Sequence, residues 1–124
     1  MLQIRSRINV ADNTGAKSLE LIGMPGKGNL LIAGIGDLIK CVVKKAIPNG
    51  TVKDHEKVLA LVVRTRKGVR RSDGSIIRFD DNAAVIIENA KEKLPKGTRV
   101  FGPIAREIKE LGYNKVASMA PEVY

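Results

Sequence analysis

Short segments in which apolar and polar residues alternate, separated by turn sequences, occupy the first two thirds of the chain. In SRINVADNTGAKSLELIG, an alternating stretch precedes a turn at residues 12–15, and in the stretch that follows Leu19 and Leu21 share one face. Side chains of a strand point alternately to its two sides, so this pattern predicts a β-hairpin. The β-branched segment LIKCVVKKAI, which follows a turn at Gly36 and Asp37, predicts a further strand.

The segment EKVLALVVRTRKG predicts a strand with two distinct faces. Positions 59, 61, 63 and 65 share one face, and positions 60, 62, 64 and 66 share the other. If the first face fills the core, Arg64 and Arg66 point outward together. The segment AAVII, after a turn at residues 80–82, predicts a last buried strand. Several short strands at this spacing favour a closed or nearly closed barrel, because closure removes exposed strand edges.

Between these two strands, the segment TRKGVRRSDGS combines a run of basic residues with a tight turn. Asp73 followed by Gly74 predicts a two-residue type I′ turn, which needs positive φ at both central positions. In that register Arg71 lies opposite Ile76. No acidic residue occurs between positions 57 and 72. Guanidinium groups match phosphate oxygens in bidentate geometry, so we interpret this hairpin as a polyanion-binding element.

The last part of the chain changes to a helical period. Pro103 suits the first position of a helix and Gly112 the position after its end, so the segment between them predicts a short amphipathic helix. Its apolar stripe consists of Ile104, Ala105, Ile108 and Leu111. Arg106 and Glu110 lie one turn apart on the opposite side. A single helical turn is also expected after Pro121.

Composition narrows the class of partner. A chain of 124 residues with 44% hydrophobic residues is the size of one domain, and a net charge of +9 indicates an acidic partner. Aromatic residues make up only 3%, so stacking of bases on aromatic side chains is not the main mode of any nucleic-acid binding. Phe79 and Phe101 are expected in the core. Neither a signal peptide nor a membrane-spanning stretch is recognisable, which favours a soluble, intracellular protein.

Candidate catalytic and metal sites have simpler interpretations. His55 is the only histidine and is expected to be exposed, while Cys41 lies in an apolar run that suits a buried thiol in a reducing compartment. One Cys and one His do not form a structural zinc site. Asp80 and Asp81 favour a turn over a carboxylate pair. The glycine-rich loop GMPGKGN lacks the ending of a phosphate-binding P-loop, so we expect no catalytic residue, metal or cofactor.

Several long motifs resemble one known family from nearly end to end. VADNTGAK, VVRTRKGVRRSDGSIIRFDDNAAVI, PKGTRVFGPIARE and KVASMAPEV occur in an order similar to that of the universal L-fourteen family of large ribosomal subunit proteins, in its bacterial or organellar form. The resemblance implies one domain over residues 1–124, mainly β. Residues 1–88 would form a small five-stranded antiparallel β-barrel with a projecting basic hairpin at about 64–79, and residues 89–124 a region of loops and short helices.

The function that the resemblance implies is structural and not enzymatic. Family members bind large-subunit ribosomal RNA, contribute to bridges with small-subunit RNA, and lie in the cytoplasmic or organellar ribosome without membrane contact. The RNA-binding residues carried over by position are Arg64, Arg66, Lys67, Arg70, Arg71 and Arg78. Lys44 and Lys45 are also expected to bind RNA. The surface expected to meet a neighbouring protein of the L-nineteen family and the ribosomal silencing factor contains Thr98, Arg99, Arg106 and Lys115.

One departure and two alternatives remain open at this point. The loop at residues 23–36 has only Lys27 where many relatives have two adjacent basic residues, which puts RNA contact by this loop in doubt. A free-standing β-barrel RNA chaperone is the second hypothesis, and it predicts binding to many RNAs. An enzyme that uses Cys41 or the Asp80 and Asp81 pair is a distant third.

Overall fold

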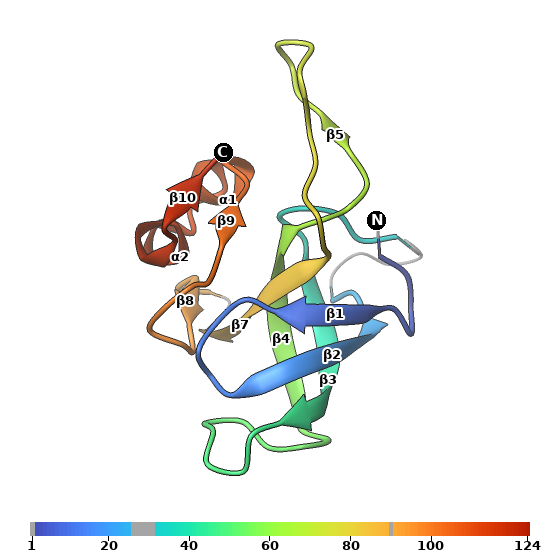
Figure 1. Cartoon of the computed structure of the whole chain (residues 1–124), viewed down its shortest axis with the longest axis vertical. Coiled ribbons are helices and arrows are strands. Elements are labelled where there is room, and N and C mark those ends of the chain that lie inside the picture. Colours follow the sequence, from blue (N-terminus) through green and yellow to red (C-terminus); the bar gives the residue numbers. More distant parts are fainter. Residues whose placement is uncertain (1, 26–31, 90) are drawn as a thin grey trace.

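Five strands form a small closed barrel (Figure 1). The computed structural model describes residues 2–25, 32–89 and 91–124, so Lys27 lies outside the described residues. The barrel strands, in the order in which they pair, are β1 (Arg7–Val10), β2 (Ala16–Gly23), β3 (Leu38–Ala46), β4 (Lys57–Arg64) and β7 (Ala83–Asn89). The hairpin and the strands expected from the alternating pattern are confirmed.

The pairing that closes the barrel is parallel, which corrects the expectation of a wholly antiparallel barrel. Four of the five pairings are antiparallel, whereas β1 and β7 run side by side in the same direction. The reason is geometric, because each antiparallel pairing reverses the strand direction. In a closed ring with an odd number of strands the last pairing must therefore be parallel. Two hydrogen bonds join β1 to β7 in this parallel pairing. The main-chain N–H of Asn9 donates to the carbonyl of Asn82 at 3.0 Å, and that of Ala11 donates to the carbonyl of Ala84 at 2.9 Å.

Two hydrophobic clusters share the strands β4 and β7. One contains Ala60, Val62 and Ile86 and packs with residues of β1, β2 and β3. The other contains Leu61 and Val63 from β4 and packs with the C-terminal part of the chain. The strand β4 is consequently buried on both faces, and this decides the environment of its last residue, Arg64.

The basic hairpin projects from the barrel, as expected (Figure 1). Its ladder consists of β5 (Val69–Arg70) and β6 (Ile76–Ile77), with Val69 opposite Ile77. The expected register is therefore wrong by one residue, and Arg71 lies opposite Ser75, whose carbonyl accepts its N–H at 2.8 Å.

The connection of the hairpin is a three-residue loop in place of a type I′ turn. Gly74 alone has a positive φ, +89°, as a three-residue loop with glycine in its last position requires. The carboxylate of Asp73 stabilises this loop by accepting hydrogen bonds from the N–H and the hydroxyl of Ser75, at 2.9 and 2.6 Å.

The C-terminal region differs most from expectation. It contains β8 (Leu94–Pro95), β9 (Pro103–Ile104), α1 (Glu107–Glu110), α2 (Asn114–Met119) and β10 (Glu122–Val123). The predicted helix is thus shorter at its start, and the residues after Pro121 form a strand and not a helical turn. The strands β9 and β10 pair in parallel, so the main chain at Pro103 and Ile104 is extended.

Side-chain burial in this region follows the prediction in part. Ile104, Ala105 and Ile108 are buried, whereas Leu111 is exposed, contrary to its place in the expected stripe. Gly112 has φ +96° and ends α1, as expected. No helix among the described residues is both long enough and apolar enough to span a membrane.

Candidate nucleic-acid interface

Four exposed cations of the projecting hairpin have no partner among the residues that the structure describes. We call them the hairpin cations: Arg66, Lys67, Arg70 and Arg78. In the part of the chain that the structure describes, their side chains form no hydrogen bond or ion pair. Their mutual repulsion is therefore not relieved internally, and a polyanion would relieve it.

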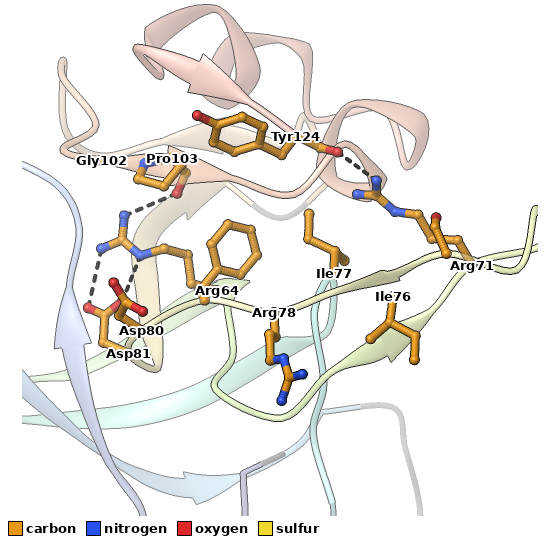
Figure 2. A pocket seen from close by; sticks show the side chains of 12 residues that line it. Arg64, Arg71, Ile76, Ile77, Arg78, Asp80, Asp81, Gly102, Pro103 and Tyr124 are labelled. Atoms are coloured by element: carbon orange, nitrogen blue, oxygen red, sulfur yellow. Dashed lines mark hydrogen bonds and ion pairs between the residues drawn. The ribbon is translucent and has the colours of Figure 1, made fainter.

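Arg64 is buried, so the expectation that it points outward is wrong. Its exposed fraction is 8%, and its Nε lies 3.1 Å from a carboxylate oxygen of Asp81. Its Nη1 donates to the carbonyl of Phe101 at 2.8 Å and to that of Pro103 at 3.1 Å, and Figure 2 shows the contact with Pro103. The outward direction expected from strand alternation fails because the C-terminal region covers the end of β4. Arg64 therefore joins three chain segments.

The backbone of Gly102 packs closely against the Arg64 guanidinium. It has φ +80°, and a Cβ at this position would overlap Nη1 of Arg64. Only glycine combines this backbone conformation with room for the buried cation. The sequence gives no local sign of this requirement, because Gly102 lies 38 positions from Arg64.

Arg71 also binds within the protein. Its Nη2 lies 2.8 Å from a carboxylate oxygen of Glu107 in α1, and its Nη1 donates to the main-chain oxygen of Tyr124 at 2.6 Å. Only 14% of its side chain is exposed. Arg64 thus holds the base of the hairpin, and Arg71 the part next to its loop, against the C-terminal region, and they fix the position from which the hairpin cations project.

Lys44 and Lys45 lie apart from the hairpin. They belong to the last residues of β3, which ends at the opposite end of the barrel (Figure 1). Lys44 forms an ion pair with Glu20 at 3.3 Å, and Lys45 is exposed. The eight expected RNA-binding residues therefore divide into two buried or half-buried arginines, four hairpin cations and a separate pair of lysines.

An open hollow of about 710 Å³ separates the hairpin from the C-terminal region. Figure 2 shows Arg64 and Arg71 at its two ends, with Ile77 pointing toward Pro103 and Tyr124, and Arg78 pointing away from them. The side chain of Phe79 contributes to the same lining. One of the hairpin cations, Arg78, thus contributes to the lining of the hollow while its side chain points outward.

Thr98 and Arg99 are positioned by the turn at residues 12–15. Asn13 accepts hydrogen bonds from their main-chain N–H groups at 2.9 and 3.1 Å and donates to the Thr98 hydroxyl at 2.8 Å. The guanidinium of Arg99 lies 5.6 Å from the centre of the Phe101 ring. Phe101 is 47% exposed, so its expected place in the core is wrong. Phe79 is half-buried.

Asp12 stabilises the turn at residues 12–15, and its role was not predicted from the sequence. One carboxylate oxygen accepts from the N–H and hydroxyl of Thr14 at 3.2 and 2.7 Å, and the other accepts from the N–H of Ile86 at 2.8 Å. Burial raises the pKa of Asp12, although these hydrogen bonds oppose the change. The sequence DNTG indicated the turn, but no local signal indicated its contact with β7 or with Thr98.

Arg106 and Lys115 are exposed on two other segments. Arg106 lies just before α1 and forms the expected pair with Glu110 at 3.8 Å, and Lys115 lies in α2. Arg106 also lines a small hollow with Arg70 and Asp73 of the hairpin. The four residues expected to meet protein partners therefore come from three segments, one of which adjoins the hairpin.

The candidate catalytic residues are not assembled into a site. Cys41 is fully buried in the barrel, His55 is exposed in a loop, and Asp81 is paired with Arg64. The described residues contain no group of three potential metal ligands.

Burial raises the pKa of the Cys41 thiol to about 12, from a reference value of 9.0. Between these values the native protein keeps the proton while the unfolded chain loses it, so stability must fall as pH rises. We expect the free energy of unfolding to decline by at most about 1.4 kcal/mol per pH unit from this thiol. Urea unfolding at about pH 8.5 and about pH 10 would show a steeper decline for the native sequence than for Cys41→Ala. Equal declines would contradict the prediction.

A comparison with protein families gives one match over the full chain. The family described as Ribosomal protein L14p/L23e matches residues 1–124. The match includes the barrel, the basic hairpin and the C-terminal region alike.

Proposed function

This chain belongs to the ribosomal protein L14p/L23e family, and we propose that the hairpin cations are its main contact with large-subunit ribosomal RNA. The family consists of non-enzymatic structural proteins, which confirms the expectation that the chain is not an enzyme. Membership implies a structural, RNA-binding role in the large ribosomal subunit. The observation that supports the specific contact is that the four hairpin cations have no partner in the described part of the chain, whereas Arg64 and Arg71 have theirs within the protein.

The mechanism follows from how the hairpin is held. Arg64 and Arg71 bind carboxylates and main-chain oxygens, so the hairpin is positioned before RNA arrives. Less conformational entropy is then lost on binding. Arginine and lysine side chains would contact phosphate oxygens and so fix the register, while discrimination between RNAs would come from their shape, since the deep groove of A-form RNA hides base edges from side chains.

A salt series tests this function. The chain would be titrated with a large-subunit ribosomal RNA fragment and with an unrelated RNA duplex of equal length. Both affinities are expected to fall by orders of magnitude between about 50 and about 200 mM salt, and the ribosomal fragment should keep at least about a tenfold advantage. Coincident curves would instead favour the free-standing RNA chaperone, which binds RNA without regard to its fold.

A second RNA contact is proposed at the other end of the barrel. Lys45 is exposed there and Lys44 is only partly neutralised by Glu20. Two basic groups at opposite ends suit a protein between two RNA surfaces, which supports a contribution to bridges with small-subunit RNA in a cytoplasmic or organellar ribosome.

The exposed C-terminal residues are proposed to bind proteins, namely a neighbour of the L-nineteen family and the ribosomal silencing factor. Arg99 is exposed while its main chain is held by Asn13, so its side chain is presented from a fixed backbone. Arg99→Glu is expected to weaken binding of the silencing factor by about tenfold or more, through like-charge repulsion or loss of a charge pair. Lys17→Glu is the matched control, because Lys17 is also exposed but lies in β2. Equal affinities for both variants would contradict the assignment.

A further inference from the structure

We propose that the hollow between the hairpin and the C-terminal strands binds one unstacked base of the RNA. This inference rests on the proposed RNA contact of the hairpin and extends it from phosphate recognition to recognition of a single nucleotide. The hollow opens to solvent, and its volume of about 710 Å³ lies within the range of roughly 300–1,000 Å³ that is usual for small-molecule sites.

The lining suits a flat, uncharged ring. Ile77 contributes from the hairpin, while Pro103 and Tyr124 contribute from the opposite side (Figure 2), and Phe79 also lines the hollow. The chain has only two Phe and two Tyr residues and no Trp. Two of these four aromatic residues line this one hollow, although they are 45 positions apart in the sequence. Aromatic faces stack well on bases of any sequence.

The charges around the hollow exclude a phosphate from its interior and favour one outside it. Arg64 is paired with Asp81, and Arg71 with Glu107, so the two cations at its ends are already neutralised. Arg78 also belongs to the lining, but its side chain points away from Pro103 and Tyr124 (Figure 2), so it would hold the RNA backbone at the edge of the hollow. A nucleotide with its base turned inward would place the base in the uncharged hollow and its phosphate against the hairpin cations.

One further group favours a nucleotide over an apolar side chain of a protein. Asp80 is exposed at the lining and forms no ion pair or hydrogen bond with any of the residues 2–25, 32–89 and 91–124. A carboxylate accepts hydrogen bonds from an exocyclic amino group or a ribose 2′-hydroxyl, whereas an apolar side chain would offer the Asp80 carboxylate no hydrogen-bond donor. The hairpin cations next to the hollow would likewise have no role for such a partner.

The test uses two RNA duplexes of equal length, one fully paired and one with a single bulged 2-aminopurine. The native chain is expected to bind the bulged RNA about tenfold more tightly and to change the fluorescence of 2-aminopurine as the base stacks on protein. Phe79→Leu and Tyr124→Leu should each remove most of this advantage while changing affinity for the paired duplex by less than about twofold. Phe101→Leu, at an exposed aromatic outside the hollow, is the matched control and should keep the advantage.

The outcomes separate this inference from the proposed function. If both RNAs bind equally and with strong salt dependence, the phosphate contact stands and the base site is wrong. If Phe101→Leu removes the advantage as fully as Phe79→Leu, the base binds elsewhere and the site is also wrong. If neither RNA nor a ribosomal fragment binds, the proposed RNA contact itself fails. Thermal unfolding of each variant would show whether Phe79→Leu is folded, and Tyr124→Leu, at a residue that is 54% exposed, gives a second reading with little effect on packing.

Discussion

Replacing all four hairpin cations by glutamine is expected to weaken binding to large-subunit ribosomal RNA by about three orders of magnitude at about 100 mM salt. Each phosphate contact contributes a slope of roughly 0.9 in a plot of log affinity against log salt for duplex DNA, and somewhat less for single strands. Four lost contacts should therefore reduce the slope by roughly three to four. Fluorescence anisotropy across a salt series measures both the affinity and the slope.

A control variant separates local contact from total charge. Lys17, Lys53, Lys91 and Lys109 are exposed lysines outside the hairpin. Their replacement by glutamine lowers the net charge from +9 by four, to +5, as the hairpin variant does. If the hairpin binds phosphates directly, the control should keep most of the slope, because long-range attraction is screened beyond about 8–10 Å at these salt concentrations. Equal losses in the two variants would mean that net charge, and not the hairpin, determines RNA affinity.

Arg64→Met is expected to reduce the free energy of unfolding by about 2–3 kcal/mol. The change removes a buried cation, leaves the carbonyls of Phe101 and Pro103 without their side-chain donor, and leaves Asp81 with only the hydrogen bond from Asn9 among the described side chains. Loss of one partner from a fully buried pair costs about 3–5 kcal/mol, but Asp81 retains access to water and would be partly rehydrated. Urea unfolding followed by circular dichroism measures the change.

Two neighbouring substitutions test the reason for this loss. Arg66→Met, at the next exposed arginine of the same segment, should change stability by less than about 0.5 kcal/mol. Arg64→Lys keeps the charge but loses the planar fork, so an intermediate loss is expected. If Arg64→Met proved as harmless as Arg66→Met, the contacts of Arg64 would not determine how the C-terminal region is held.

The barrel strands were predictable because their signals are local. Alternation in β1 and β2, the β-branched run of β3 and the apolar segments of β4 and β7 all follow from which side chains face a core within a few residues. The three-residue hairpin loop was missed because Asp73 followed by Gly74 suits two turn types. The hydrogen bonds from Ser75 to the Asp73 carboxylate favour the longer loop, and they depend on a residue outside the predicted turn.

The C-terminal errors have a different cause. Pro103 and Ile104 match a helix start in local sequence, but they pair with Glu122 and Val123, 19 residues further along the chain. A strand pairing of this kind outweighs a weak helical preference, since helical propensities differ by only a few tenths of a kcal/mol for most residues. The same packing covers the outer face of β4 and turns Arg64 from an expected surface residue into a buried one.

The sequence by itself therefore determined the strands of the barrel, the projecting basic hairpin and the class of acidic partner, because periodicity, turn residues and charge are properties of neighbouring positions. Only the tertiary structure decided which arginines of the hairpin remain available for RNA. Arg64 and Arg71 find carboxylates and carbonyls contributed by residues 81, 101, 103, 107 and 124, while Arg66 and Arg70 find none among the described residues. All six cations of this segment look alike in sequence, and what distinguishes them is the position of the C-terminal region, which no local pattern specifies.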